Sequence, residues 1–262
     1  MKISISNIGW SKENDIRVFN LMKEYGFTGL EIAPTRIFPE NPYADLDAAR
    51  KWTVKIKEDY GFEIPSMQSI WYGRSEKVFG SEEERVSLID YTKKAIDFAE
   101  AVGCKNLVFG CPRNRSISET GDTNIAIEFF REIGDYAFLH HTVIAMEANP
   151  PIYNTNFINK TSEAIELIEK VDSKGFLLNL DVGTMIENEE DMDVVKDKLH
   201  LVNHVHISEP GLKPIQKREI HNELAEMLKI VRYEGFVSIE VGKQERIDEL
   251  EKMIQYVKNI FE

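Results

Sequence analysis

The feature that most constrains the fold of this chain is a regular alternation of short apolar segments with longer amphipathic segments. Eight apolar segments have the length of strands, and each is followed by a stretch with helical spacing of apolar residues. Such alternation is typical of parallel sheets, in which a helix connects each strand to the next. Eight repeats within 262 residues predict an α/β fold, a single (β/α)8 TIM barrel in which residues 1–262 form one domain.

The element boundaries follow from the apolar spacing and from residues that end helices. The expected strands span residues 2–8, 28–33, 63–70, 106–110, 142–147, 176–180, 202–206 and 236–240. The expected helices span residues 15–25, 46–60, 82–102, 123–139, 161–171, 189–201, 219–233 and 244–260. Gly26, Gly61 and Gly103 follow three of these helices, as glycine often does at helix C-termini. No nucleotide-binding glycine motif follows any strand.

Each of the last four expected strands ends in a side chain that can bind a metal ion. These side chains are Glu147, Asp181, His206 and Glu240. In a parallel barrel the C-terminal ends of the strands meet at one mouth, so we expect the four groups to converge. Three carboxylates and an imidazole are costly to bury together unless a cation or proton compensates them. The alternative is that each residue is an ordinary polar side chain at a strand end with local hydrogen bonds. That explanation would have to hold for all four residues at the same level of the barrel.

The chemistry of these ligands predicts one divalent cation. Oxygen and imidazole donors suit Mn²⁺, which we favour, and also Mg²⁺, Co²⁺ or Zn²⁺. Other side chains near strand ends are candidates for substrate binding, with core packing or surface ion pairs as the alternative roles. These candidates are Trp10, Glu31, Gln68, Arg113, Arg115, Asn149 and His221. Trp71 and Tyr72 are further aromatic candidates, whereas His204 is expected to pack one layer below His206 in the barrel.

Charge and composition narrow the class of partner. The net charge of −13 opposes binding to the phosphate backbone of nucleic acids, so we expect a small-molecule substrate and no nucleic-acid partner. No apolar stretch approaches the ~18 residues of a membrane span, and no signal-peptide pattern opens the chain. Cys104 and Cys111 flank one expected strand and would lie roughly 20 Å apart, too far for a disulfide. Free thiols indicate the cytoplasm, and a homo-oligomer is left open.

Several motifs give the chain a resemblance to a known family. Glu147, Asp181, His206 and Glu240, with Gly-Leu-Glu31 on the second strand, resemble the xylose isomerase-like TIM barrels, a family of sugar phosphate isomerases and epimerases. The resemblance spans essentially the whole chain. Its most specific local matches are Phe109-Gly-Cys-Pro-Arg-Asn-Arg115, Glu147-Ala-Asn-Pro-Pro-Ile-Tyr153 and His206-Ile-Ser-Glu-Pro-Gly211.

The ketose 3-epimerase branch of this family implies roles for the four strand-end residues. There, four such residues bind Mn²⁺ or a similar ion, which implies that Glu147, Asp181, His206 and Glu240 are the metal ligands. The two glutamates also move protons in that branch, which implies catalytic roles for Glu147 and Glu240. The substrate pocket departs from the branch: a substrate-binding histidine is replaced by Thr184, and an arginine by Leu212. The metal core therefore matches more closely than the substrate pocket.

The resemblance implies an isomerase or epimerase that acts on a sugar, a sugar phosphate or a keto-acid. A metal on the substrate oxygens would stabilise the enediolate formed when a proton α to a carbonyl is removed. The same ligands would also serve a dehydratase of a keto-sugar or keto-inositol, which is the alternative function. DNA-repair endonucleases of the endonuclease IV type share the barrel but need a histidine-rich three-zinc cluster. All six histidines of this chain lie at or after position 140, which disfavours that activity.

Overall fold

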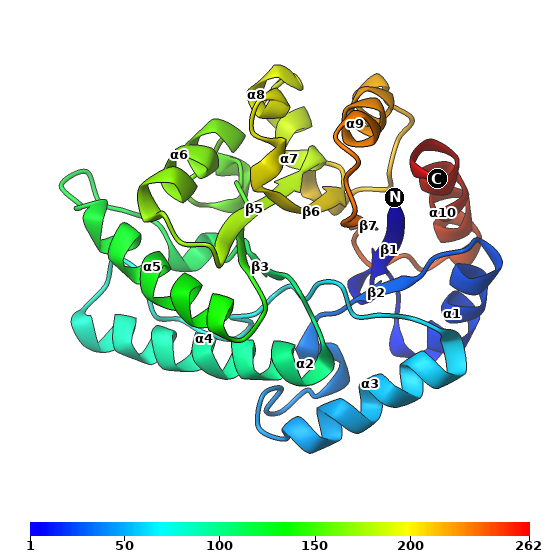
Figure 1. Cartoon of the computed structure of the whole chain (residues 1–262), viewed down its shortest axis with the longest axis horizontal. Coiled ribbons are helices and arrows are strands. Elements are labelled where there is room, and N and C mark those ends of the chain that lie inside the picture. Colours follow the sequence, from blue (N-terminus) through cyan, green and yellow to red (C-terminus); the bar gives the residue numbers. More distant parts are fainter.

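A seven-stranded parallel sheet curls through the centre of the molecule, and helices surround it (Figure 1). The computed structural model describes all 262 residues. The strand order is β2-β1-β7-β6-β5-β4-β3, and every pairing is parallel. The strands are β1 (Lys2–Ser6), β2 (Gly29–Glu31), β3 (Leu107–Phe109), β4 (Ile144–Met146), β5 (Phe176–Asp181), β6 (Val202–Ile207) and β7 (Phe236–Ile239).

The eighth expected strand, residues 63–70, is present only as isolated bridges. Glu63 bridges Gly29, and Met67 bridges both Ile32 and Leu107. This segment therefore lies between β2 and β3 and completes the ring that the seven strands leave open. Pro65 explains why no regular strand forms here, because proline has no N–H to donate to a neighbouring strand.

Helices connect the strands, and most match the sequence prediction to within a few residues. They are α1 (Asp15–Glu24), α2 (Pro34–Ile37), α3 (Leu46–Tyr60), α4 (Glu82–Val102), α5 (Asn124–Leu139), α6 (Thr161–Val171), α7 (Val182–Glu187), α8 (Asp193–Lys196), α9 (Glu219–Ile230) and α10 (Ile247–Phe261). A capping box of Ser81 and Glu84 begins α4, because each side chain binds the other residue's backbone N–H. Gly61 and Gly103 end α3 and α4 in the left-handed conformation, at φ 79° and 71°.

The prediction of one helix over residues 189–201 is wrong. The chain instead forms α7 directly after β5, then the short α8 and a 3₁₀ turn at Leu199–Leu201. Asp181 explains the early start, because its carboxylate accepts the backbone N–H of Thr184 and caps α7. The acidic run 189–193 carries four like charges in five residues, which disfavours a continuous helix there. The four-residue α2 was not predicted.

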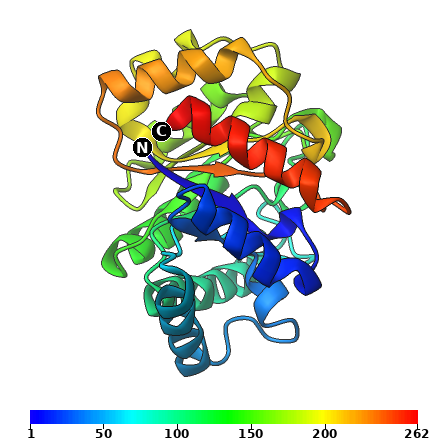
Figure 2. The ribbon, with the colours of Figure 1, turned by 90° about the vertical axis from the view of Figure 1, so that its right-hand side faces the viewer.

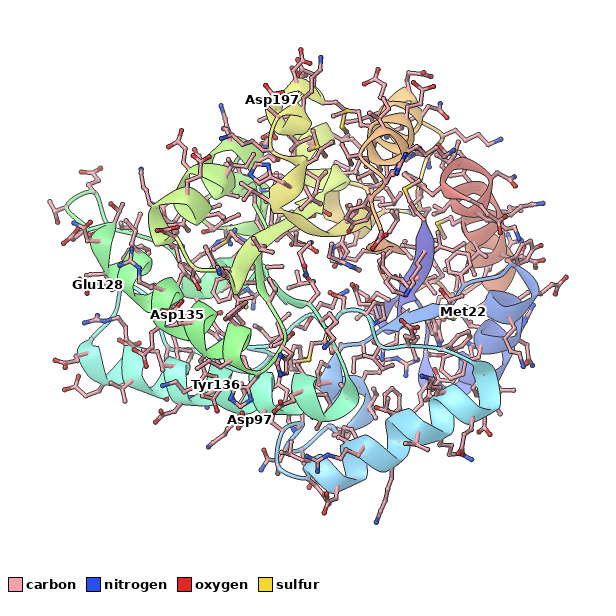
Figure 3. All side chains as sticks on the ribbon, in the orientation of Figure 1. Met22, Asp97, Glu128, Asp135, Tyr136 and Asp197 are labelled. Atoms are coloured by element: carbon pink, nitrogen blue, oxygen red, sulfur yellow. The ribbon has the colours of Figure 1, made fainter.

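The apolar faces of strands and helices meet in one hydrophobic core of 66 buried residues. Charged side chains such as Glu128 on α5 and Asp197 just after α8 lie on the outside and point away from it (Figure 3). The two termini lie close together, as both ribbon views show (Figures 1 and 2). No helix combines the length and apolar composition that crossing a membrane requires. Because all strands are parallel, their C-terminal ends form one face of the barrel, where a parallel barrel places its functional residues.

Candidate metal centre

The four strand-end residues predicted to bind a metal converge in the structure. Glu147 follows β4, Asp181 ends β5, His206 lies in β6 and Glu240 follows β7. One potential ligand atom from each lies within 4.8 Å of those of the other three. The Nδ1 atom of His206 lies 3.1 Å from Glu147 Oε2 and 3.3 Å from Glu240 Oε2. Parallel register produces this convergence, since Asp181 is paired directly with His206 across β5 and β6.

The geometry of this cluster fits one divalent cation. Ligands on opposite sides of an ion with bonds of ~2.1 Å are roughly 4.2 Å apart, and the four candidate ligand atoms all lie within 4.8 Å of one another. Three carboxylates and one imidazole supply the hard and borderline donors that such ions prefer. The Oδ1 atom of Asn179 is buried beside the cluster without a hydrogen-bond partner. Because buried polar atoms are normally paired, this unpaired acceptor is a further sign that the site is built to hold an additional group.

The protonation of the cluster reflects crowding of negative charge. Burial, together with the charge of Glu147, raises the pKa of Asp181 to about 6. Burial also raises the pKa of Glu240 to about 7, against the opposing effect of His206. Burial alone would lower the pKa of His206, but the carboxylates of Glu31 and Glu240 outweigh it and hold that pKa well above its usual value. In the metal-free protein, protons therefore supply part of the positive charge that a cation would bring.

Glu31 lies beneath the cluster and orients His206. Its Oε2 atom accepts the Nε2–H groups of His206 at 3.0 Å and of His204 at 2.9 Å. Its Oε1 atom accepts the amide of Gln68 at 2.9 Å, so both oxygens are used and the residue is fully buried. A proton held on Nε2 leaves Nδ1 of His206 to face the three carboxylates, which is the arrangement of a carboxylate–histidine–metal triad. Glu31, His204 and His206 form a second compact group, but their contacts are hydrogen bonds.

Glu147 is held by a chain of amide and guanidinium groups. Asn149 donates to Glu147 Oε1 at 3.0 Å, and Asn179 donates to Glu147 Oε2 at 2.8 Å. Arg115 in turn donates to Asn149 Oδ1 at 3.0 Å and to the backbone oxygen of Glu147 at 2.9 Å. A side chain at Gly110 would meet Glu147 Oε1 at 3.1 Å, so the glycine leaves room for the carboxylate. The position of Glu147 is therefore fixed from three sides.

Asp181 is fixed by the start of α7 and by the loop after β6. Its Oδ1 atom accepts the backbone N–H of Thr184 at 2.6 Å, and its Oδ2 atom accepts the hydroxyl of Ser208 at 2.5 Å. Ser208 also accepts the backbone N–H of Gly183, where a Cβ would approach the hydroxyl to 2.5 Å. The hydrogen bonds to ionised oxygen oppose the effect of burial on the pKa of Asp181.

A cavity of about 180 Å³ opens above the cluster at the C-terminal mouth of the barrel. Of the predicted substrate-binding residues, Gln68 and Asn149 line it, together with Glu147, Asp181 and Glu240. Its other lining residues are Ser69, Val108, Gly110, Cys111, Pro112, Tyr153, Ser208 and Leu212. The roles of Ser208 and Asn179 were missed by the sequence analysis. The signal was available, because both lie two residues from a predicted ligand and alternate residues of a strand share a face.

Four predicted substrate-binding residues besides Glu31 lie outside this cavity. Trp10 is buried and donates its indole N–H to Asp15 at 2.8 Å. Arg115 is fully buried beneath Glu147 and burial lowers its pKa to about 10, so its role is to hold the site. His221 is buried in α9 against Tyr256. Arg113 is exposed at the rim and lines a neighbouring depression.

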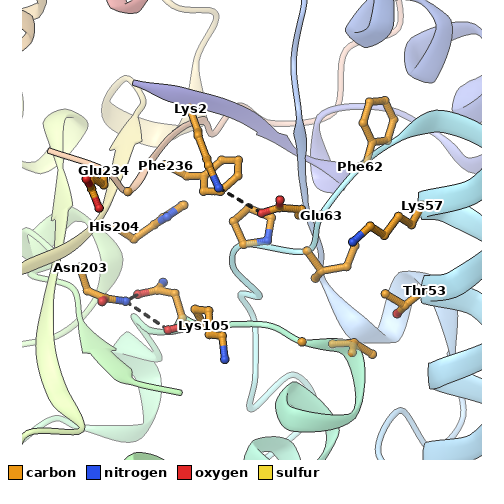
Figure 4. A pocket seen from close by; sticks show the side chains of 16 residues that line it. Lys2, Thr53, Lys57, Phe62, Glu63, Lys105, Asn203, His204, Glu234 and Phe236 are labelled. Carbon is orange, nitrogen blue, oxygen red and sulfur yellow. Dashed lines mark hydrogen bonds and ion pairs between the residues drawn. The ribbon is translucent and has the colours of Figure 1, made fainter. Parts of the chain in front are cut away.

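A larger cavity of about 440 Å³ opens at the opposite end of the barrel, among the N-terminal ends of the strands (Figure 4). Three lysines line it, but Lys2 is paired with Glu63 at 3.4 Å and Lys105 donates to a backbone oxygen. His204 lies at its inner wall and separates it from Glu31. Size alone does not identify the functional site, because three of the four potential ligands, Glu147, Asp181 and Glu240, line the smaller cavity.

Comparisons with known proteins agree with this architecture. Several solved structures share the fold over nearly their whole length. A 3-keto-D-glucoside 4-epimerase from E. coli has a TM-score of 0.78 at 21% identity, with 99% of each chain covered. A D-psicose 3-epimerase from Clostridium cellulolyticum has a TM-score of 0.78 at 16% identity, with 100% of each chain covered. An AP endonuclease of family 2 from Brucella melitensis has a TM-score of 0.74 at 19% identity, with 98% of each covered.

Among curated proteins, none matches the sequence with statistical significance. A sequence model of the xylose isomerase-like TIM barrel matches residues 19–260. That match covers nearly the whole ring of strands and helices and includes all four residues of the candidate metal centre. On this evidence the chain belongs to the xylose isomerase-like TIM barrel family.

Proposed function

We propose that the protein is a metal-dependent isomerase or epimerase that moves a proton α to the carbonyl of a sugar. The observation that supports this most strongly is the convergence of Glu147, Asp181, His206 and Glu240 at the barrel mouth, where the three carboxylates line one cavity. Two of the solved structures that share the fold are epimerases of sugars or sugar glycosides by their names. The chemistry of the site agrees with such a reaction.

The four residues would hold one divalent cation. Oxygen and imidazole donors suit Mn²⁺, Mg²⁺, Co²⁺ or Zn²⁺, and the resemblance to the ketose 3-epimerase branch favours Mn²⁺. When bound, the ion would act as a Lewis acid for the oxygens of the substrate carbonyl and its neighbouring hydroxyl. The protein contributes fixed positions, because hydrogen bonds from Asn149, Asn179 and Ser208 orient the carboxylates before substrate arrives.

Glu147 and Glu240 are the proposed acid and base. They come from non-adjacent strands, β4 and β7, with Asp181 and His206 on the strands between them. One carboxylate would take the α-proton from one face of the reacting carbon, and the other would return a proton to the opposite face. In the protein without metal, burial raises the pKa of Glu240 to about 7, so this carboxyl exchanges a proton readily near neutral pH. Asp181 and His206 would serve mainly as ligands.

The lining of the cavity favours a neutral substrate. Three carboxylates face it, and no lysine or arginine lines it. Leu212 lies in the wall at the position where the sequence departs from the ketose 3-epimerase pattern. A phosphate or carboxylate inside this cavity would meet negative charge without a basic partner, at a cost in desolvation and repulsion. We therefore favour an uncharged keto-sugar over a sugar phosphate or keto-acid.

Incubation with Mn²⁺ and a panel of keto-sugars in heavy water tests this function. An epimerase or isomerase exchanges the α-proton for deuterium and yields a product of unchanged composition, which NMR and mass spectrometry detect. Loss of water from the product would identify the dehydratase instead. Incision of abasic duplex DNA without any exchange on sugars would identify a nuclease. Metal-stripped protein is the control, and exchange at an equal rate without metal would contradict the proposal.

A further inference from the structure

A second depression adjoins the catalytic cavity at the barrel mouth. It has a volume of about 530 Å³ and shares the lining residues Ser69, Cys111 and Pro112 with the catalytic cavity, so the two spaces adjoin each other. Its remaining lining residues are Trp71, Tyr72, Gly73, Arg74, Arg113 and Asn114. It is formed by two loops, one following the segment that completes the barrel and the other following β3.

Size indicates that the two spaces accommodate different parts of one ligand. The catalytic cavity of 180 Å³ equals the volume of about six water molecules, which is the scale of one sugar ring. Small-molecule sites usually offer roughly 300–1,000 Å³, and the catalytic cavity reaches that range only with the adjoining depression. A substrate longer than one ring would extend across Ser69, Cys111 and Pro112 into the second space.

The loops that form the depression are braced rather than loose. Asn114 donates its side-chain amide to the backbone oxygens of Arg74 at 3.2 Å and Glu76 at 2.8 Å. Its own backbone oxygen accepts the N–H of Val78 at 2.8 Å. Trp71 forms a firm floor, since it is buried and its indole N–H donates to Thr92. A preformed surface of this kind binds a ligand without a large ordering cost.

The chemistry of the surface fits an uncharged ring. Tyr72 is 72% exposed, so its aromatic ring is free to pack against another flat, partly apolar face. Arg113 is exposed and makes no ion pair with any acid, although the chain carries 45 acidic residues, and its guanidinium can donate to hydroxyls. Arg74 is already bound by Glu76 and Ser87, and Lys77 by the backbone oxygen of Arg113. One free cation beside an aromatic ring suits a sugar better than a phosphate.

We propose that this depression binds the non-reacting ring of a glycoside whose keto-sugar ring reacts in the catalytic cavity. The substrate class is then a keto-glycoside or keto-disaccharide, with Tyr72 packing on the second ring and Arg113 donating to its hydroxyls. This inference rests on the proposed sugar epimerase or isomerase function, which supplies the reacting ring. The linkage between the rings would lie over Ser69, Cys111 and Pro112.

Kinetics on paired substrates tests the proposal. Solvent deuterium exchange with Mn²⁺ would be measured for 3-keto-maltose and for 3-keto-glucose, along with D-fructose 6-phosphate as an anionic probe. We expect kcat/KM to favour the disaccharide by about tenfold, the scale of one aromatic contact with its burial. Tyr72→Ala should remove most of that preference and leave the monosaccharide rate unchanged, while Tyr72→Phe should keep it. Phe138→Ala, which truncates another exposed aromatic residue far from the mouth, is the matched control.

A binding measurement distinguishes the proposed second sugar site from the proposed catalytic function. NMR of ¹³C-labelled tyrosine would follow the Tyr72 ring during titration with unoxidised maltose and with glucose. A shift with maltose at concentrations where glucose gives none supports the depression as a sugar site even if no keto-sugar is turned over. Equal rates on both keto-sugars, unchanged in Tyr72→Ala, would overturn it and leave the epimerase function intact. A preference for the phosphorylated ketose that Arg113→Ala abolishes and Tyr72→Ala does not would also overturn it.

Discussion

Replacing Glu31 by glutamine tests how the barrel interior prepares the metal centre. The carboxylate has no unused oxygen: Oε2 accepts N–H groups from His204 and His206, and Oε1 accepts one from Gln68. Glutamine has nearly the same shape but offers one oxygen and one NH₂ group. If the amide oxygen faces the histidines, its NH₂ meets the NH₂ of Gln68. In the reverse orientation, its NH₂ meets both imidazole N–H groups, so either orientation leaves donors facing each other.

The expected magnitude follows from these lost hydrogen bonds. His206 can escape the conflict by moving its proton to Nδ1 or by turning its ring, and either change removes the nitrogen that faces the carboxylates. Loss of a partner behind a metal-bound histidine typically costs 10–100-fold in metal affinity, or about 1.4–2.7 kcal/mol. His204→Gln removes the other imidazole but keeps the contact between Glu31 and His206, so a change of only about threefold is expected there.

Calorimetric titration with Mn²⁺ measures the affinity, and electron paramagnetic resonance of bound Mn²⁺ reports the geometry of the ligands. Glu209→Gln is the matched control, since Glu209 is also a buried carboxylate but binds Arg218 instead of the cluster. Circular dichroism checks that every variant is folded. If Glu31→Gln is folded and binds Mn²⁺ within twofold of the wild type with an unchanged spectrum, the positioning argument is refuted.

Three further outcomes are expected. Asp181→Asn should lose at least tenfold in Mn²⁺ affinity, because one charged ligand is gone while the cap of α7 remains, and metal analysis giving a full equivalent would contradict the assignment. Glu147→Gln and Glu240→Gln should each keep much of the metal yet lower kcat by ~10²-fold or more, and near-normal turnover in both would reduce these glutamates to ligands. Because Asp181 and Glu240 have pKa values of about 6 and 7, above those of ordinary carboxyls, these two groups bind more protons in the metal-free fold than in the unfolded chain between about pH 4 and 7. Their contribution to the free energy of unfolding should fall as pH rises through that window, and the raised pKa of His206 extends the fall upward. Burial lowers the pKa of His204, and that of His221 to about 4, and these two groups act in the opposite direction. Urea unfolding with a chelator at pH 5 and pH 8 measures this for the wild type and for Glu240→Gln, and an equal change of stability with pH in both proteins would be inconsistent with the raised pKa of Glu240.

The sequence by itself determined the ring of alternating elements and the four candidate ligands. Apolar periodicity is a local property, so α3 and α6 begin and end where the pattern placed them. Glu147, Asp181, His206 and Glu240 were found because parallel strands bring their C-terminal ends together whatever the detail of the loops. Local composition also misled, since residues 189–201 have helical spacing but Asp181 caps an earlier helix.

Tertiary structure alone decided what surrounds the ligands. Arg115 and Glu31 are polar and near strand ends, as substrate-binding residues often are, yet both are fully buried and hold ligands in place. The direction of a side chain depends on how the barrel curves and on which neighbours offer hydrogen bonds. Neither can be predicted from the spacing of residues in the sequence. The position of the depression at Tyr72 beside the cavity at the barrel mouth likewise comes from two loops about 40 residues apart that Asn114 joins. Asn114 forms these hydrogen bonds with residues distant in the sequence, so the local pattern of residues does not reveal them.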